Sequence, residues 1–254
     1  MAFAELKIFS EALGIQTSVN VVVPQRSTDG EIGTTTGATG DKLKCLYLLH
    51  GLSDDYSIWM RRTSIERYAQ NYGICVVMPS GGKSFYTDMK YGMNYYTYIA
   101  KELPKIIGEL FKVSGKREDN YIAGLSMGGY GALKIGIKEC ESFCAAAAFS
   151  AVADIEHGKE LFRDVYVPIF GKNMDIHDSE NLFKLFEKHA DGVNRPRIFM
   201  GVGTEDFLYE DNVKLKKHIE SLNYDFTYRE SAGTHSWEFW DEYIRYALEW
   251  MFCR

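Results

Sequence analysis

Short apolar runs alternate with helical patterns along most of the chain, and this alternation limits the folds it can adopt. Each run is long enough for a strand buried on both faces. The runs lie at residues 45–49, 74–78, 121–123, 145–149 and 197–202. The helical patterns lie at residues 64–71, 96–111, 129–138, 213–222 and 237–252. Alternating strands and helices predict an α/β fold, with a mostly parallel central sheet and helices on both faces.

The start of the chain and one later segment depart from this alternation. Two strand-like segments, 6–9 and 17–24, flank a turn at Gly14 and predict an antiparallel start to the sheet. Residues 26–42 are rich in Gly, Thr and Ser, so we expect an exposed, mobile loop there. Residues 154–192 fit the alternation poorly and predict a small helical insertion over the carboxyl edge of the sheet. We expect one domain spanning residues 1–254.

Composition excludes several classes of function. The chain is 46% hydrophobic and 25% charged, which is typical of a soluble globular protein. Its net charge is −6 and its basic residues are scattered, which argues against nucleic-acid binding. The sequence has neither a signal-peptide pattern at its start nor an apolar stretch of about 18 residues, so we expect a cytoplasmic protein without a membrane partner. Five cysteines without CxxC spacing predict neither a disulfide framework nor a metal site.

Ser126 lies in the segment Gly124-Leu125-Ser126-Met127-Gly128, between an apolar strand and a glycine-rich helix start. This is the context that a G-x-S-x-G nucleophile elbow requires. The tight turn presents the serine oxygen above the sheet edge, and the Met127 amide points toward any oxyanion formed there. The alternative is a chance match at a helix cap, where serine is common. The setting favours Ser126 as a catalytic nucleophile.

The segment after residues 45–49 predicts the second half of an oxyanion site. His50, Gly51 and Leu52 follow the strand directly, where this fold places its other oxyanion donor. We assign that donor to the Leu52 N–H and expect Gly51 to border the substrate. His50 precedes Ser126, whereas the fold places its base after the serine, so we interpret His50 as structural.

The base and the acid are expected in loops that follow the last two predicted strands. His235 lies just after the predicted strand 225–229 and before the final helix, and catalytic side chains are carried on such loops. His157 is the rival base. Asp206 follows the strand at 197–202 and would orient the imidazole and stabilise its cation. Glu205 beside it is the alternative acid. Asp206 also suits a helix N-cap.

Aromatic residues follow the strand at 74–78 and suit the wall of an ester pocket. Among these, Tyr86 is our predicted substrate contact, together with Trp237 two residues past the base. The alternative is that such aromatics fill the space between loop and sheet. We expect Trp240 to be buried on the inner face of the last helix.

The residues singled out above resemble the esterase D-like putative esterases, a family that includes S-formylglutathione hydrolases, acetyl and feruloyl esterases and bacterial tributyrin esterases. The resemblance spans nearly the whole chain. Its carrying segments are residues 48–53, 77–79, 85–88, 123–131, 203–209 and 234–237.

The chain looks most like the tributyrin esterase group. That resemblance implies the α/β-hydrolase fold, a cytoplasmic serine carboxylesterase for short-chain acyl esters without a cofactor, and Ser126, Asp206 and His235 as its triad. It also implies a homo-oligomer, since relatives often form dimers or tetramers. Phe85 stands where the related segment is expected to carry tryptophan, which implies a slightly altered pocket.

Other functions share the same serine chemistry. These are a thioesterase for S-formylglutathione, an acetyl xylan or feruloyl esterase acting on saccharide esters, and an acyltransferase. A different class, a non-catalytic binding protein, usually lacks a triad member, whereas every candidate is present here.

Overall fold

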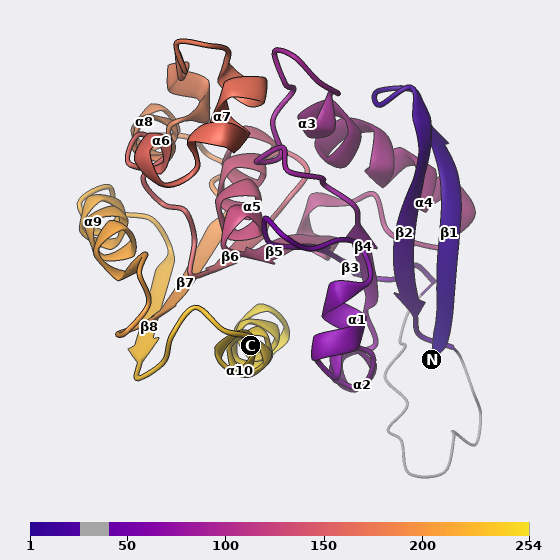
Figure 1. Cartoon of the computed structure of the whole chain (residues 1–254). Coiled ribbons are helices and arrows are strands. Elements are labelled where there is room, and N and C mark those ends of the chain that lie inside the picture. Colours follow the sequence, from indigo (N-terminus) through magenta and orange to yellow (C-terminus); the bar gives the residue numbers. More distant parts are fainter. Residues whose placement is uncertain (26–40, 254) are drawn as a thin grey trace.

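A computed structural model describes residues 1–25 and 41–253 and shows one eight-stranded sheet with helices on both faces (Figure 1). The loop predicted at 26–42 lies outside the described residues, except for its last two positions. The strands are β1 (Ala2–Ser10), β2 (Ile15–Val23), β3 (Cys45–Leu49), β4 (Cys75–Pro79), β5 (Asn120–Leu125), β6 (Ala145–Phe149), β7 (Arg197–Gly203) and β8 (Phe226–Ser231). Their order across the sheet is β1-β2-β4-β3-β5-β6-β7-β8.

The sheet is antiparallel only at its amino-terminal side among the described strands. β1 pairs with β2 and β2 with β4 in antiparallel fashion, and every later pairing is parallel. The predicted antiparallel start and mostly parallel sheet are therefore confirmed. Strands β3 to β6 are buried along their whole length because helices cover both of their faces. Cys45 and Cys75 lie opposite each other in β3 and β4 as buried thiols.

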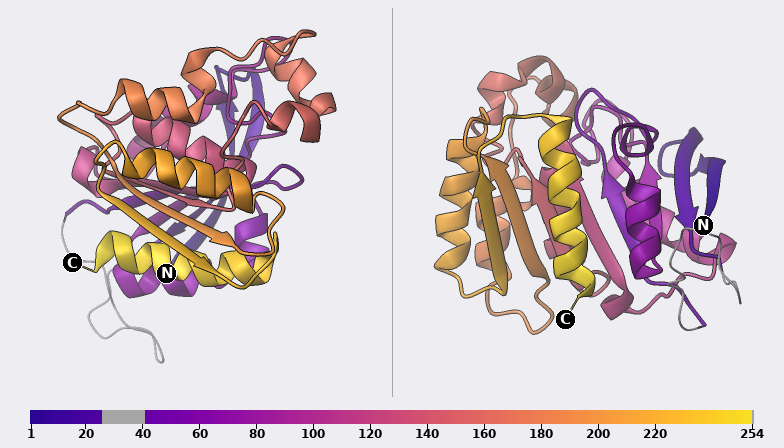
Figure 2. Two further views of the ribbon diagram at one scale, coloured as in Figure 1. Left: turned by 90° about the vertical axis from the view of Figure 1, so that its left-hand side faces the viewer. Right: turned by 90° about the horizontal axis from the view of Figure 1, so that it is seen from below.

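Two layers of helices cover the sheet. One face packs against α4 (Leu103–Leu110), α5 (Met127–Lys138) and α9 (Tyr209–Glu220). The other face packs against α1 (Ile58–Arg62), α2 (Ile65–Tyr72) and α10 (Trp237–Phe252), and Figure 2 shows α10 lying along the sheet beside them.

The predicted helix at 96–111 is divided in the structure. It comprises α3 (Tyr95–Thr97), the π-helical turn η1 (Tyr98–Glu102) and α4, with Pro104 in the first turn of α4. Proline is tolerated there because the first turn needs no amide donor. A short 3-10 turn, η2 (Arg117–Asp119), leads into β5.

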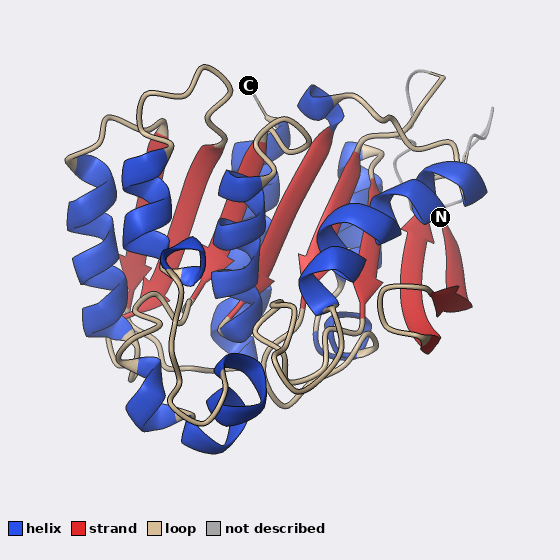
Figure 3. Ribbon diagram, turned by 90° about the horizontal axis from the view of Figure 1, so that it is seen from above, coloured by secondary structure: helices blue, strands red, loops and turns tan. Residues whose placement is uncertain are grey.

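The segment predicted as a helical insertion follows β6 and consists of short helices beyond the carboxyl ends of the parallel strands (Figure 3). Its elements are α6 (Gly158–Leu161), α7 (Arg163–Phe170), η3 (Asp178–Glu180) and α8 (Leu182–Lys188). Its apolar residues join the core that α5 covers. The insertion therefore packs onto the helical layer, with α8 against α5 and α9.

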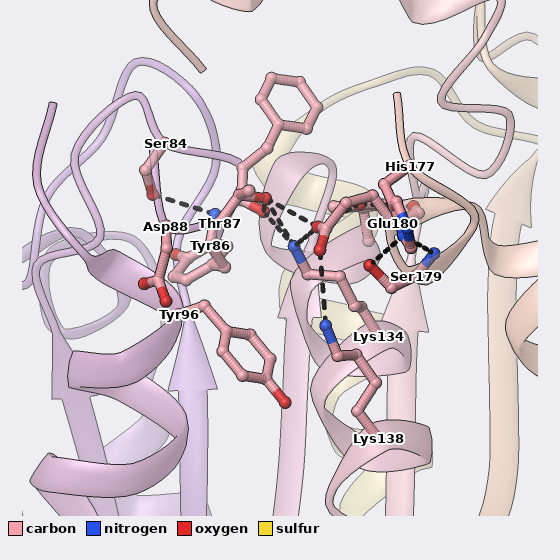
Figure 4. Close-up of polar contacts among 12 residues, drawn as sticks. Ser84, Tyr86, Thr87, Asp88, Tyr96, Lys134, Lys138, His177, Ser179 and Glu180 are labelled. Atoms are coloured by element: carbon pink, nitrogen blue, oxygen red, sulfur yellow. Dashed lines mark hydrogen bonds and ion pairs between the residues drawn. The ribbon is translucent and has the colours of Figure 1, made fainter. Parts of the chain in front are cut away.

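A buried ion pair ties this insertion to α5 (Figure 4). The Lys134 ammonium lies 2.6 Å from a Glu180 carboxylate oxygen and donates to Thr87 Oγ1 at 2.6 Å and to the Phe85 carbonyl at 3.1 Å. The Lys134 side chain has no exposed surface. Burial lowers the pKa of Lys134 to about 8, and the Glu180 carboxylate opposes that shift. One cation thus joins α5, the loop after β4 and the insertion.

Replacing Glu180 by glutamine is expected to destabilise the protein by about 3 kcal/mol or more, because Lys134 would stay buried without its counter-charge. The free energy of unfolding in urea measures the effect. Glu187→Gln is the matched control, since Glu187 pairs with Lys184 at the surface and should cost less than about 1 kcal/mol. Equal losses in the two variants would contradict the role given to the buried pair.

Candidate active site

Ser126 occupies the sharp turn between β5 and α5. Its backbone has φ 53° and ψ −118°, a conformation that side-chain-bearing residues rarely adopt. The turn needs glycine on both sides: a Cβ on Gly124 would lie 2.3 Å from the Gly128 carbonyl oxygen, and one on Gly128 would lie 2.6 Å from the Leu49 and His50 oxygens. The predicted elbow geometry is therefore present.

The segment after β3 lies against this turn. A Cβ on Gly51 would be 3.8 Å from the Ser126 Cβ, and both Gly51 and Leu52 line the same pocket as Ser126. Met127 is the first residue of α5, so its N–H has no acceptor within the helix. The structure thus brings both predicted oxyanion residues, Leu52 and Met127, next to Ser126.

His50 holds the segment after β3 in place. Its Nε2 accepts the Gly81 N–H at 2.8 Å, so its Nδ1 carries the proton and donates to the Gly51 carbonyl at 2.7 Å. Burial lowers the pKa of His50, which favours this neutral form. Both ring nitrogens are used within the loop, consistent with the structural role predicted for His50.

Asp206 and His235 meet at the carboxyl ends of β7 and β8. His235 Nδ1 lies 2.9 Å from Asp206 Oδ2 and 3.1 Å from Oδ1, and Oδ1 also accepts the Leu208 N–H at 2.9 Å. Burial opposes a charge on Asp206, but hydrogen bonds from His235, the Leu208 N–H and Ser150 hold its pKa below the usual value. The aspartate is therefore a charged partner for the imidazole.

The alternatives to this pair lie in other settings. Glu205 is exposed, and its carboxylate accepts the Gly233 N–H, which fixes the loop that carries His235. His157 Nδ1 lies 2.7 Å from Asp211 Oδ2, between the insertion and α9, and it is not among the residues that line the pocket beside Ser126. The structure therefore brings Asp206 and His235, rather than these two, to the site.

A pocket of about 530 Å³ opens over the nucleophile. Its charged members include Asp54, Arg62 and Glu238, and burial raises the pKa of Asp54. The aromatic residues that line it are Phe162, Phe207, Trp237 and Trp240. Trp237 therefore lines the pocket, and Trp240 is largely buried as expected but also reaches the pocket.

Tyr86 lies elsewhere than predicted. Its side chain has no exposed surface, and its hydroxyl donates to the His50 carbonyl at 2.9 Å. Cβ atoms at Gly81 and Gly131 would both collide with its ring, at 2.4 Å. Tyr86 thus supports the loop after β3 from beneath. It matches the alternative expectation that such aromatic residues fill the space between loop and sheet.

Phe85 acts on the pocket from behind. Its ring lies 4.9 Å from that of Tyr166 and 5.7 Å from that of Phe162, between ring centroids, and Phe162 lines the pocket. The size of the side chain at position 85 therefore affects the position of Phe162 in the pocket wall, although Phe85 itself does not line the pocket.

Several pocket residues escaped the sequence analysis. Phe162 lies in the insertion, where the sequence shows no hydrophobic periodicity that would indicate which side chains face the pocket. Arg62 is the last residue of α1, a helix of five residues that the sequence analysis did not predict. Trp59 in α1 donates to the Leu49 carbonyl at 3.0 Å and packs edge-on against Trp237 at 5.1 Å. Phe207 follows Asp206 directly, and that adjacency was the available signal.

Comparison with known proteins places this geometry among the esterases. The family model described as "Putative esterase" matches residues 10–251. An acetyl esterase of Caldicellulosiruptor saccharolyticus is 31% identical over 263 residues, which cover 99% of this chain and 98% of the relative.

Two solved structures from Staphylococcus aureus are similar over the whole chain. The substrate-bound fluorophosphonate-binding serine hydrolase F is 33% identical, with a TM-score of 0.90 and coverage of 100% of this chain and 99% of the other. The S-formylglutathione hydrolase FrmB, an apoenzyme, is 33% identical, with a TM-score of 0.86 and coverage of 99% and 98%. The predicted α/β-hydrolase fold is confirmed.

Two further findings concern the described residues 1–25 and 41–253. No group of three or more His, Cys, Asp or Glu side chains among them is arranged to hold a metal ion. None of the helices in this part of the chain is long and apolar enough to cross a membrane.

Gly128→Ala is expected to displace the segment after β3, because the new Cβ meets two backbone carbonyls rather than movable side chains. We expect a loss of about 1–3 kcal/mol in unfolding free energy, together with most of the hydrolysis of p-nitrophenyl acetate. Gly108→Ala in α4 is the control, since its Cβ meets nothing within 4 Å and should be neutral or stabilising. Full activity in Gly128→Ala would contradict the steric argument.

His235→Ala is expected to lower kcat by several orders of magnitude, because His235 is the histidine that lines the pocket beside Ser126 in the described part of the chain. His157→Ala, which also removes a histidine paired with an aspartate, should leave kcat within a few-fold of the unaltered protein. Steady-state hydrolysis of p-nitrophenyl acetate measures both. A comparable loss in the two variants would rule out His235 as the sole base.

Proposed function

Since the chain belongs to the putative esterase family and is a serine hydrolase of carboxylic esters, we propose that it cleaves short-chain acyl esters through an acyl-enzyme on Ser126. The observation that carries this proposal is the convergence of the strained Ser126 turn and the Asp206–His235 pair on one pocket. Esters of acetyl to butyryl size are the proposed substrates, and the acetyl esterase relative supports that range.

The proposed reaction begins with proton removal from Ser126 by His235 Nε2 as the serine oxygen attacks the ester carbonyl. The Leu52 and Met127 amides stabilise the negative charge that develops on the carbonyl oxygen. The resulting imidazolium is stabilised by Asp206 at Nδ1 and gives its proton to the departing alcohol. Water, activated by the same imidazole, then releases the carboxylic acid and restores the serine.

The pocket supports both halves of a small ester. Aromatic side chains at Phe162, Phe207 and Trp237 offer apolar surface, whereas Gly51, which has no side chain, lies beside Ser126. Charged groups at Asp54, Arg62 and Glu238 line the same pocket, and both carboxylates interact electrostatically with Arg62. We infer that these charged residues face the alcohol portion of the ester, because they can hydrogen-bond the polar groups of an alcohol better than the aromatic residues can.

The second candidate is thioester hydrolysis of the S-formylglutathione type. It is favoured by the 33% identity and full-length similarity to the Staphylococcus aureus S-formylglutathione hydrolase. The same triad would serve both substrates, since only the leaving group changes from an alcohol to a thiol. Action on saccharide esters remains a further proposal within the oxygen-ester class.

Finer sequence predictions accompany this proposal. Membership of the tributyrin esterase group, cytoplasmic location, assembly into a homo-oligomer and single-domain organisation stay predictions from the sequence.

A substrate panel tests the proposed function. We expect kcat/KM on p-nitrophenyl acetate and butyrate to exceed that on S-formylglutathione and on p-nitrophenyl esters of long acyl chains. Acetylated xylan and methyl ferulate extend the panel to saccharide and plant esters. Every rate should fall by several orders of magnitude in Ser126→Ala, because that variant lacks the attacking oxygen. A dominant rate on S-formylglutathione would overturn the preference for oxygen esters, and full activity in Ser126→Ala would overturn the mechanism.

A further inference from the structure

We propose that Phe162 is the specificity-determining residue of the pocket, because its ring closes the acyl side and limits the acyl group to butyryl size. The proposal rests on the esterase reaction proposed above. It assigns the two halves of the ester to the two faces of the sheet.

The pocket over Ser126 takes its wall from both faces of the sheet. Arg62 of α1 and the indoles of Trp237 and Trp240 on α10 come from one face (Figure 1). Phe162 belongs to the insertion, and its ring packs against the apolar core on the opposite face. A bound ester therefore has α1 and α10 on one side and Phe162 on the other.

The reaction decides which half of the ester lies on which side. In the proposed mechanism His235 gives its proton to the departing alcohol, so the alcohol must leave beside the imidazole. The imidazole lies just before α10, and its ring is 4.8 Å from that of Trp240 and 4.6 Å from that of Phe207, between centroids. The acyl group then extends away from α10, toward Phe162.

Buried rings behind Phe162 prevent it from moving back. Its ring centroid lies 5.7 Å from that of Phe85 and 6.2 Å from that of Tyr166. Those two rings pack edge-on at 4.9 Å, and neither residue has exposed surface. The Phe85 carbonyl accepts a hydrogen bond from the Lys134 ammonium at 3.1 Å, which ties this packing to α5. Since protein interiors are close-packed, the Phe162 ring cannot withdraw without displacing these groups.

The backbone of Phe162 is also held on both sides. Its N–H donates to the Gly158 carbonyl at 2.9 Å, and its own carbonyl accepts the N–H groups of Val165 at 2.9 Å and Tyr166 at 3.0 Å. Phe162 thus joins α6 to α7 as a half-buried residue between the buried rings and the pocket. An acyl chain that reaches its ring meets a fixed wall.

The test measures kcat/KM of Phe162→Ala and the unaltered protein on p-nitrophenyl acetate, butyrate, hexanoate and octanoate. These esters share one leaving group, so differences among them belong to the acyl chain. Each methylene that gains an apolar site is worth about fourfold, so the octanoate-to-butyrate ratio should rise by at least about tenfold in the variant. The rate on acetate should change little, because an acetyl group is too short to reach the ring.

Phe162→Trp separates a wall from a residue that merely stabilises the insertion. The larger ring should shorten the acyl side, so kcat/KM on butyrate should fall several-fold relative to acetate. A change that only loosened the insertion would not narrow the preference in this way. An unaltered butyrate-to-acetate ratio in Phe162→Trp would contradict the proposal.

Two controls are matched to Phe162. Tyr166→Phe keeps the ring behind Phe162 and removes a buried hydroxyl that has no hydrogen-bond partner among the described residues, so the chain-length preference should stay unchanged. Phe207→Ala removes a phenylalanine ring from the His235 side of the same pocket. It should change the rates on all four esters by a similar factor and leave their ratios unaltered.

Phe162→Leu keeps the test decisive if the alanine variant folds poorly, and it should raise the octanoate-to-butyrate ratio by a smaller factor. A folded variant with the original ratio would overturn the proposal, as would an equal rise in Phe207→Ala. In either case, hydrolysis of acetate that is lost in Ser126→Ala would leave the proposed esterase function standing. Failure of the unaltered protein to cleave any of the four esters would overturn that function as well.

Discussion

The close approach of backbone to backbone at Gly128 is the constraint on which the rest of the site depends. With no Cβ there, the start of α5 lies against the Leu49 and His50 carbonyls at the end of β3. That contact sets the strained turn at Ser126 beside the segment that carries Leu52. The proposed nucleophile and oxyanion donors therefore share one junction, and their relative positions are set before any substrate binds.

Helix α5 also holds part of the pocket wall in place. Lys134, two turns further along α5, is paired with Glu180 of the insertion and bonded to the Phe85 carbonyl. Phe85 in turn packs against Phe162, which lines the pocket. A buried cation is costly unless it is fully bonded, so these contacts allow few other arrangements of the insertion. We infer that the insertion serves as a fixed wall over the site.

The sequence predicted the elements that repeat a simple pattern and missed those that do not. The runs at 45–49 and 145–149 match β3 and β6 residue for residue, because a strand buried on both faces is apolar throughout. The five residues of α1 are too few to show a helical period. Tyr86 was misplaced because proximity to a strand end does not say whether a side chain points into the pocket or beneath it.

The acid and the base of the proposed triad differ in how they are held, and the difference follows from the role proposed for each. The Asp206 side chain is wholly buried, so a fixed charge is kept in place by hydrogen bonds alone. The His235 side chain is 19% exposed, and in the proposed reaction it exchanges a proton with both the serine and the leaving group. Phe207 and Trp240 pack against its ring at centroid distances of 4.6 and 4.8 Å. Ring contacts hold the plane of an imidazole without occupying its nitrogens, so Nε2 is left for chemistry while Nδ1 stays on the aspartate.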